Sequence, residues 1–374
     1  MTHEVATLLR REVMDPLKQR FVGRDEVIEL IALALVAGEH LFLYGPPGTA
    51  KSALIRHFAQ SVGGAYFEYM LTRFSEPNEI FGPVDIARLR QGVVSTITEG
   101  MLPRAEFAFL DEIFNANSAI LNNLLTVLNE RTYRRGAELH KLPLLSLFSA
   151  SNTLPEDDAL RALFDRFLLR CHVHHLPRES MAALLRAGWV LERPQGLGQP
   201  VTSDQLRMLA ARLPDVDVSS IAEVYADTVF KLRDLGIDFS DRRAVKAQKL
   251  LAASALLCGR VRAERSDLWV LRYVWDREEQ IAPLRALVNG ILEGTESNQA
   301  HPMARPAEKV NPELLARELE DLRAQVQAGG LSVSGIARLR ERLTGMADQC
   351  AWVPEDKTRT FLLDRTRELL GALQ

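Results

Sequence analysis

A glycine-rich loop that ends in a lysine and a serine stands out among the segments of this sequence that could do chemistry. Residues 45–52 read GPPGTAKS and lie between the apolar run LFLY and a helix-like segment, SALIRHFAQ. The spacing fits the pattern G-x-x-x-x-G-K-[ST], whose backbone N–H groups converge on phosphate oxygens at a helix N-terminus. The loop residues predicted to bind a nucleotide are Gly45, Pro46, Pro47, Gly48, Thr49, Ala50, Lys51 and Ser52.

Two side chains of this loop are expected to contact the charged parts of the ligand. Lys51 would reach the β- and γ-phosphates as a point charge, and Ser52 would offer its hydroxyl to Mg²⁺. Ala50 replaces the last glycine of the pattern, which costs only a methyl group if that residue keeps a negative φ. The alternative is a Gly/Pro turn before a helix that happens to contain Lys-Ser, and the strand–loop–helix context argues against it.

A pair of acids follows an apolar strand about 60 residues after the loop. The run Phe-Ala-Phe-Leu at 107–110 leads directly into Asp111 and Glu112. Adjacent strand ends would place these acids beside the phosphates, at the carboxyl edge of the sheet where α/β proteins bind ligands. Asp111 would then hold Mg²⁺, and Glu112 would polarise the attacking water as a general base. An acidic helix N-terminus, which the helix macrodipole favours, is the structural alternative.

The elements that must position these groups alternate between strands and helices. This alternation predicts an α/β fold with a mostly parallel five-stranded sheet that is covered on both sides. The predicted strands are His40–Tyr44, Ala65–Met70, Phe107–Asp111, Leu144–Ala150 and Leu168–Val173, and two predicted helices are Lys51–Ser61 and Ser118–Glu130.

Two short segments interrupt the alternation and are predicted to form β-hairpins. Residues Asp85–Thr98 carry β-branched side chains on both sides of Gln91-Gly92, and Arg131–Leu142 has a turn at Arg135-Gly136. The second hairpin is basic, so that it could contact nucleic acid, an acidic polypeptide or a neighbouring chain. Exposed charges also protect strand edges, and the sequence does not decide between these roles. The basic residues are Arg131, Arg134, Arg135 and Lys141.

After Pro177 the strand signals fade and helical patterns follow. The segment RPQGLGQP at 193–200 reads as a joint, and the polar stretch with two prolines after residue 292 reads as a linker. Beyond it, apolar residues recur with helical spacing at Leu315, Leu319, Leu322 and Val326, and at Ile336, Leu339, Leu343 and Met346. The predicted domains are an α/β nucleotide-binding core at 1–180, a helical lid at 181–292, a linker at 293–311 and a C-terminal helical element at 312–374.

Composition excludes several classes of protein. The 46 Lys+Arg and 49 Asp+Glu residues leave a net charge of −3 in a chain of 374 residues, which argues against a general polyanion binder. The cysteines Cys171, Cys258 and Cys350 lie far apart, so that a disulfide framework is not expected. With neither a signal-peptide core nor about 20 consecutive apolar residues, the sequence predicts a cytoplasmic chain.

The loop and the paired acids together resemble those of AAA+ ATPases, and the inserts resemble those of the MoxR family, specifically its RavA-like branch. The resemblance covers roughly residues 15–290 and implies ATP/ADP and Mg²⁺ as ligands, bound between core and lid. In the segment FVGR at 21–24, Val22 and Gly23 resemble residues that pack near the adenine. The resembling loops of this branch carry the same alanine before the lysine.

The resemblance also implies catalytic roles for three further positions. Asn152 resembles sensor 1, which orients the attacking water, and Arg166 resembles an arginine finger that reaches the γ-phosphate bound by the adjacent subunit. In Ser240–Arg243, Arg242 is the first choice for sensor 2 and Arg243 the second. Each has a simpler interpretation: Asn152 as a turn residue, Arg166 as the partner of Asp165, and the arginine pair as a solvated helix face.

The segment CHVHH at 171–175 looks like a metal cluster, but the pattern argues against one. In a strand, His172 and His174 share one face while Cys171, Val173 and His175 share the other. A structural zinc site needs four converging ligands, and the sequence has no second group at metal-site spacing. The cysteines are therefore expected to pack as small apolar residues.

Membership of this family would imply a ring of identical chains, most simply a hexamer, that hydrolyses ATP and remodels a protein client. MoxR-like proteins typically partner with proteins that carry a von Willebrand A domain, which makes such a protein the expected partner. We expect residues 312–374, after the linker, to be too short to hold the additional β-rich domain of the longer relatives. Two alternatives remain: a nucleic-acid-dependent motor or clamp that uses the basic hairpins, and a scaffold that binds nucleotide without turnover.

Overall fold

The computed structural model divides the chain into two compact units. The first comprises Met1–Leu284 with Gly294–Ala304, and the second comprises Arg285–Glu293 with Arg305–Gln374. The structure describes residues 2–92, 95–135, 138–191, 201–293, 300–304, 312–327, 336, 339–340, 342–343, 346–347, 350 and 356–372. The predicted joint at 193–200 and most of the predicted linker therefore lie outside the described residues.

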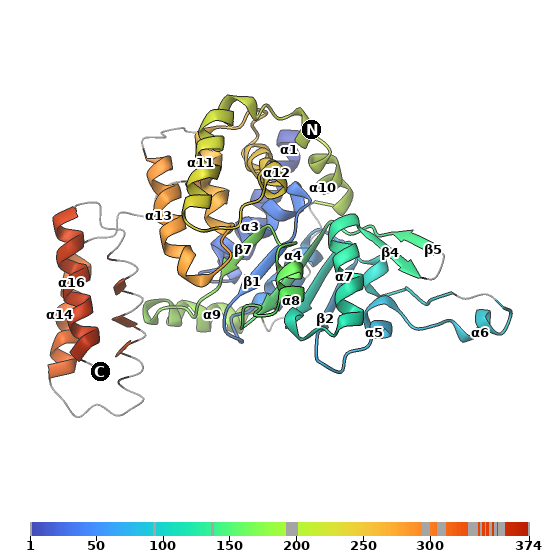
Figure 1. Cartoon of the computed structure of the whole chain (residues 1–374), viewed down its shortest axis with the longest axis horizontal. Coiled ribbons are helices and arrows are strands. Elements are labelled where there is room, and N and C mark those ends of the chain that lie inside the picture. Colours follow the sequence, from blue (N-terminus) through green and yellow to red (C-terminus); the bar gives the residue numbers. More distant parts are fainter. Residues whose placement is uncertain are drawn as a thin grey trace. The chain divides into compact units, whose positions relative to one another are not determined.

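A five-stranded parallel sheet forms the centre of the first unit (Figure 1). Its strands lie in the order β2-β3-β6-β1-β7. Every residue of β6 is buried, as are the first four of β3, and consecutive burial along a strand means that both faces of the sheet are covered. The strands are β1 (Leu41–Tyr44), β2 (Tyr66–Met70), β3 (Phe107–Asp111), β6 (Ser146–Ser151) and β7 (Leu169–His172).

All five predicted strands are present, but one expected neighbourhood is wrong. The acid-bearing strand β3 does not lie next to β1, because β6 lies between them and pairs with both. The register places Asp111 opposite Ala150, and Tyr44 opposite Ser151. The carboxyl ends of β3, β6 and β1 therefore still meet at one edge of the sheet.

Helix α3 (Asp25–Ala37) is the central helix of this unit. All of its residues from Val27 to Ala37 are buried, because it contacts strands β1 and β7 as well as helices α10 and α12. Helix α4 (Lys51–Ser61) contacts β2 and β3, and α7 (Ser118–Glu130) packs against α8 (Asp158–Phe164). Both α4 and α7 have the predicted bounds.

The two predicted hairpins have different outcomes. Strands β4 (Thr132–Arg135) and β5 (Glu138–Lys141) pair antiparallel, which confirms the second hairpin. The first is wrong, since the short helix α6 (Ile86–Leu89) and an isolated bridge between Val84 and Thr96 take its place. The physical reason is a helix cap, because the Asp85 carboxylate accepts hydrogen bonds from two N–H groups of α6. Both segments project from the same side of the sheet in Figure 1.

Helices dominate the remainder of the first unit. The N-terminal segment comprises α1 (Thr2–Leu8), a π-helical stretch and α2 (Asp15–Arg20), and α5 (Pro77–Phe81) precedes the first insert. After the sheet come α9 (Met181–Leu191), α10 (Ser203–Ala210), α11 (Ala222–Asp234) and α12 (Asp241–Leu257), followed by the 3-10 segment Arg265–Tyr273.

In the second unit, the apolar residues that recur with helical spacing gather in one cluster. It includes residues of α14 (Pro312–Gln327) and α16 (Asp356–Ala372), and α13 (Ile281–Leu292) extends across the division between the units. Packing of one apolar stripe against another is what the spacing predicts. Within the described part of the chain, no helix is long and apolar enough to cross a bilayer. The buried cluster residues are Leu315, Leu319, Leu322, Leu339, Leu343, Met346, Cys350, Leu362 and Leu369.

Candidate functional site

The phosphate-loop candidate connects the end of β1 to the start of α4. The Lys51 ammonium donates to the carbonyl oxygens of Gly45 at 2.9 Å and Pro46 at 2.8 Å, so it lies on the inner side of the loop. The Gly45 N–H donates to the Ser151 carbonyl at 3.1 Å, which holds the loop against β6. A Cβ atom at Gly45 would lie 2.1 Å from the Val173 carbonyl oxygen, so this position requires glycine.

Ala50 does not have the negative φ that would make replacement of the motif's last glycine by alanine nearly free of cost. Its φ is 64° and its ψ is 24°, which is left-handed backbone, immediately before α4 begins. An L-residue in this conformation costs roughly 1–2 kcal/mol relative to the right-handed region. The loop therefore holds a strained residue at the position where the motif has glycine, and the expectation of a nearly free substitution is wrong.

Arg24 is a residue of this site that the sequence analysis did not select, although its neighbours Val22 and Gly23 were chosen. Its Nε donates to the Thr49 carbonyl at 3.1 Å, and its Nη2 donates to the His174 carbonyl at 3.0 Å. One guanidinium thus connects the loop to the chain that follows β7. Its position directly after Gly23 in the adenine-side segment was the available signal.

Two acids occupy the carboxyl end of β3. Asp111 accepts a hydrogen bond from the Glu112 N–H, and Glu112 has a φ of 52°, which is again left-handed. Burial raises the pKa of Asp111, while the pKa of Glu112 is raised by burial and by the charge of Asp111. Burial lowers the pKa of Lys51, although both acids act in the opposite direction. These three charged groups are therefore close enough to influence one another.

Asn152 follows β6 directly, and its side chain is exposed. Ser151, one residue earlier, is buried, and its hydroxyl lies 3.4 Å from a carboxylate oxygen of Glu112. The loop, the two acids and Asn152 therefore share the carboxyl edge of the sheet, as their sequence positions predicted. Their roles toward a ligand stay predictions.

The groups at this edge fit a triphosphate with Mg²⁺. A helix of 11 residues starts at Lys51, so its first N–H groups and its ammonium offer positive potential to phosphate oxygens. Ser52, half-buried in the first turn, supplies a hydroxyl, and Asp111 supplies a partly desolvated carboxylate. Hydroxyl and carboxylate oxygens are the ligands that Mg²⁺ prefers.

Arg166 lies at the other edge of the sheet. It follows α8 and precedes Leu169, the first residue of β7. The phosphate loop, in contrast, follows the last residue of β1. Because β1 and β7 are parallel, Arg166 and the loop lie at opposite edges of the sheet. Its Nη1 lies 3.3 Å from a carboxylate oxygen of Asp165. Arg166 therefore forms the ion pair with Asp165 that was the simpler interpretation of the sequence. Its Nε is buried and has no hydrogen-bond partner among the described residues.

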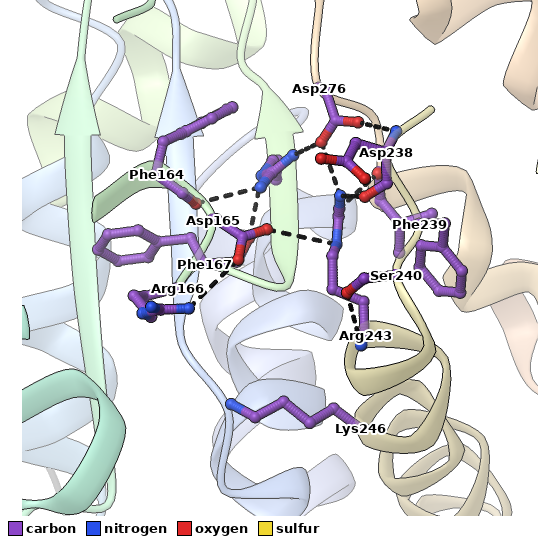
Figure 2. A network of polar contacts seen from close by, with 12 residues as sticks. Phe164, Asp165, Arg166, Phe167, Asp238, Phe239, Ser240, Arg243, Lys246 and Asp276 are labelled. Carbon is purple, nitrogen blue, oxygen red and sulfur yellow. Dashed lines mark hydrogen bonds and ion pairs between the residues drawn. The ribbon is translucent and has the colours of Figure 1, made fainter. Parts of the chain in front are cut away.

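Arg243 belongs to a buried network of polar groups, shown in Figure 2. Its side chain, in the first turn of α12, donates to Asp276 at 2.8 Å and to the carbonyl oxygens of Asp238 at 2.6 Å and Val274 at 2.8 Å. Asp165 lies 3.9 Å from its Nε. The residue is 3% exposed, and both of its Nη atoms donate inside the protein, while its buried Nε has no hydrogen-bond partner among the described residues.

Arg170 completes this network and was not selected from the sequence. It is buried in β7 and forms an ion pair with Asp276, and it also donates to the carbonyl oxygens of Phe164 and Phe167. Burial and the neighbouring charge of Arg243 lower the pKa of Arg170 to about 10. The signal for it was a single charged residue inside the apolar strand run LLRCHV.

Arg242 is exposed and points away from this network. Its Nη2 donates to the Asn129 side chain at 3.1 Å. Two residues after Asn129, the Arg131 guanidinium donates to the carbonyl oxygens of Gly38 and Leu145, which precede β1 and β6. Arg242 therefore lies at the amino edge of the sheet, as Arg166 does.

The candidate residues thus fall into two groups at opposite edges of the sheet. The loop, the acids and Asn152 lie at the carboxyl edge, and Arg166, Arg242 and Arg243 lie at the amino edge. Neither lid arginine lies at the phosphate loop of its own chain, although the lid residue Glu278 accepts a hydrogen bond from Tyr44, the residue before the loop. Binding of the nucleotide between core and lid stays a prediction.

The histidine-rich segment at the end of β7 packs as the strand pattern predicted. The rings of His172 and His174 lie 3.8 Å apart on one face, while Cys171 and Val173 are buried on the other. Among the described residues, no group of three or more His, Cys, Asp or Glu side chains could hold a metal ion.

Comparison with known proteins identifies relatives of most of the first unit. Residues 7–211 match the family model of the MoxR domain in the MoxR-vWA-beta-propeller ternary systems, and residues 221–288 match an AAA lid domain. An uncharacterized protein of Methanocaldococcus jannaschii is 39% identical over 72% of this chain and 71% of its own length. Chaperone MoxR1 of Mycobacterium tuberculosis is 31% identical over 55% of this chain and 54% of its own length.

A solved structure extends this similarity to the fold. The crystal structure of a proposed ATPase from Cytophaga hutchinsonii is 17% identical and has a TM-score of 0.63, covering 79% of this chain and 96% of that chain. At this identity the likeness establishes the fold alone.

Proposed function

Since this chain belongs to the MoxR family of AAA+ ATPases, we propose that it hydrolyses ATP in a ring of identical chains and uses the energy to remodel a protein client. The observation that carries this proposal is the division of the candidate catalytic residues between two edges of one sheet. A loop that binds phosphate and arginines that face away from it form a complete site only when two chains meet. The RavA-like branch within the family stays a prediction.

The carboxyl edge would bind the nucleotide and prepare the water. Backbone N–H groups of residues 45–52 and the Lys51 ammonium hold the phosphates, while Ser52 and Asp111 hold Mg²⁺, which neutralises charge on the β- and γ-phosphates when bound. Glu112 takes up the proton of the attacking water, and its raised pKa makes it a stronger base than an exposed glutamate.

The amino edge would serve the neighbouring chain. Arg166, whose Nε has no partner within the described residues, supplies positive charge to the γ-phosphate held by the adjacent protomer, in the role of an arginine finger. Arg242 is the better candidate for sensor 2 because it is exposed, whereas Arg243 is buried and both of its Nη atoms donate to Asp276 or to carbonyl groups. A hexamer is the ring size we propose.

A protein with a von Willebrand A domain is the partner that the family favours. The matching family model is named for systems in which MoxR, von Willebrand A and β-propeller proteins occur together, and a relative from Mycobacterium tuberculosis is named a chaperone. We infer that ATP turnover moves the lid and the two inserts, which transmit the change to the bound client.

The test compares two substitutions at the same edge of the sheet. Glu112→Gln should keep binding a fluorescent ATP analogue with Mg²⁺ and keep the ring, but lose hydrolysis by about 100-fold or more, as for loss of a general base. Lys51→Ala should lose binding itself. Hydrolysis by Glu112→Gln at the wild-type rate would contradict the role of this acid. Affinity capture with the Glu112→Gln ring in ATP should retain a protein with a von Willebrand A domain.

The alternative, a nucleic-acid-dependent motor, depends on the basic hairpin of β4 and β5. Arg131 is unavailable for it, because its guanidinium is engaged by Gly38 and Leu145 at the amino edge of the sheet. Arg134 and Lys141 are exposed. Stimulation of hydrolysis by DNA that falls steeply as salt rises would favour this alternative, and its absence would favour the protein client.

A further inference from the structure

Helix α9 presents an apolar face to solvent. Its exposed residues all lie on one side of the helix, and five of the six are apolar. Leu185 is 68% exposed and Trp189 is 73% exposed, although burial of such side chains normally stabilises a fold. Contiguous apolar patches of this kind mark interaction sites. The exposed residues are Met181, Ala182, Leu185, Arg186, Trp189 and Val190.

An apolar groove lies elsewhere on the same unit, between helices α11 and α12. It has a volume of about 400 Å³ and is lined by side chains of both helices, among them Tyr225, Val229 and Ala244. Phe230 is 61% exposed and Val245 is 67% exposed at its walls. A groove between two helices that offers apolar walls to solvent suits the apolar face of a third helix.

We propose that the α9 face of one chain docks in the α11–α12 groove of a second copy of the chain. The spacing of Met181, Leu185 and Trp189 at i, i+4 and i+8 is that of a helix which places anchor residues in a groove. Arg186 is the sole charged residue of α9, and the charged residues that line the groove are Arg233 and Asp241, which form an ion pair at 2.7 Å. The Asp241 carboxylate is still almost fully exposed and can accept a second cation. Face and groove are different surfaces, so the contact is head-to-tail and generates a ring or a filament.

The positions of the two surfaces fit the divided site, and here the inference rests on the proposed function. Helix α9 begins shortly after His174 and Leu176, which contact Arg24 and Gly23 beside the phosphate loop. The groove is lined by Ala244 and Val245, which directly follow the two arginines at the start of α12. Docking would therefore hold the loop edge of one chain beside the arginine edge of the next, which the divided site requires.

Cross-linking between separately prepared chains tests this contact. A Trp189→Cys chain and a Val245→Cys chain are mixed with ATP and Mg²⁺ and treated with a short bismaleimide. We expect a covalent dimer in the mixture and at most a weak one in either chain alone. Val261→Cys is the matched control, because Val261 is also 67% exposed but does not line the groove. The wild-type chain measures background from Cys171, Cys258 and Cys350.

A second measurement gives the contribution of Trp189, the proposed anchor residue, to self-association of the chain. Trp189→Ala should weaken self-association in sedimentation velocity at least about tenfold, as expected for loss of a buried aromatic anchor, while Val261→Ala should leave it unchanged. Trp189→Lys combined with Val245→Glu in one chain should regain part of the association that each substitution loses, because opposite charges then meet across the contact.

Three outcomes would overturn the docking. The first is a mixture that gives no more dimer than the Val261→Cys control, and the second is association unaffected by Trp189→Ala. The third is an intrachain cross-link between Trp189→Cys and Phe361→Cys, which would assign the α9 face to helix α16. If these occur while the chain still binds ATP and needs Arg166 for hydrolysis, the docking is wrong and the proposed function stands. A chain that does not bind ATP contradicts the proposed function.

Discussion

The two edges of the sheet differ in how well their buried charges are compensated by neighbouring groups. At the carboxyl edge, Asp111 and Glu112 have raised pKa values, and Ala50 and Glu112 hold left-handed backbone. At the amino edge, Arg243 makes three hydrogen bonds inside the protein, and the charges of two arginines lower the pKa of Asp276 although its burial opposes this. One edge keeps charges poorly compensated, while the other neutralises them.

This difference indicates which edge is built for a ligand and which parts are built for stability. Poorly compensated charge and backbone strain lower stability, so they persist where a ligand compensates them. The amino edge contains one exception. Arg166 and Arg242 each have a single described polar partner, Asp165 and Asn129 respectively, and Arg242 is exposed. These two arginines are therefore the residues of that edge most available to a neighbouring chain.

The largest expected effect comes from separating the two edges in different chains. Lys51→Ala disables the carboxyl edge and Arg166→Ala the amino edge, and each alone should lower hydrolysis about 10³-fold or more. In an equal mixture of the two chains, about a quarter of the head-to-tail contacts would pair an intact loop with an intact arginine. The mixture should therefore regain a readily measured fraction of the wild-type ATPase rate.

A second mixture is the control for this mixing experiment. A mixture of Lys51→Ala with Glu112→Gln, which disables the same edge twice, should regain nothing because each chain then lacks part of its own loop edge. Equal recovery in both mixtures, or full activity of Arg166→Ala as a monomer, would remove the distinction between the edges.

The next effect separates two neighbouring arginines of α12. Arg243→Ala should lower the free energy of unfolding by about 2–3 kcal/mol, somewhat less than for a fully broken buried ion pair because Arg170 still neutralises Asp276. Arg242→Ala, at an exposed position, should change it by less than about 0.5 kcal/mol and instead lower hydrolysis. Urea unfolding and ATPase rates measured on both variants check this. Comparable unfolding curves for the two would show that the network carries no stability.

The pH dependence of stability should have opposite signs at the two edges. A raised pKa in the folded state means that Asp111 and Glu112 stabilise the fold when protonated, and this contribution is lost as pH rises from about 4 through their raised pKa values. A lowered pKa means that Asp276 stabilises the fold above its unfolded pKa, and its contribution is lost as pH falls through the folded value.

Asp111→Asn isolates the first of these two effects. Because the side chain is about half exposed, solvent screening limits the gain in unfolding free energy at pH 7 to at most about 1 kcal/mol. The gain should shrink as pH falls toward 4, where the wild-type acid becomes protonated. Thermal unfolding of both proteins between pH 4 and 7 measures it, with Asp276→Asn as the comparison that should destabilise most at neutral pH. A destabilised Asp111→Asn at pH 7 would contradict the desolvation of this acid.

Local patterns in the sequence were sufficient for most of the sheet and for the loop, but not for features set by distant contacts. The strand before Gly45 and the helix after Ala50 follow from apolar runs and a phosphate-loop pattern, which are local. The insertion of β6 between β1 and β3 depends on long-range pairing, so the sequence placed the acid strand beside the loop incorrectly. The orientation of the lid arginines likewise depends on how α12 packs on α3.

Single residues illustrate the same limit. Arg24 and Arg170 act through carbonyl oxygens that lie far away in the sequence, such as Thr49, His174 and Trp275, and no local pattern encodes such partners. Asp85 shows the converse case, in which a short-range capping signal was present but the β-branched residues nearby were given more weight.

The smallest effect tests the strain at the loop itself. Ala50→Gly should raise the free energy of unfolding by a few tenths to about 1 kcal/mol, because glycine adopts left-handed backbone without steric cost but loses more entropy on folding. Ala53→Gly is the matched control, since the same change inside α4 should lower stability by about 1 kcal/mol.

Opposite signs for two identical substitutions three residues apart would locate the strain at Ala50 alone. If both substitutions destabilise equally, residue 50 does not hold left-handed backbone in the free protein, and the carboxyl edge stores less strain than the comparison of the two edges assumes. If Ala50→Gly also changes the affinity for ATP with Mg²⁺, the strain is coupled to the ligand, because only a conformation that differs between the free and bound loop would transmit the substitution to binding.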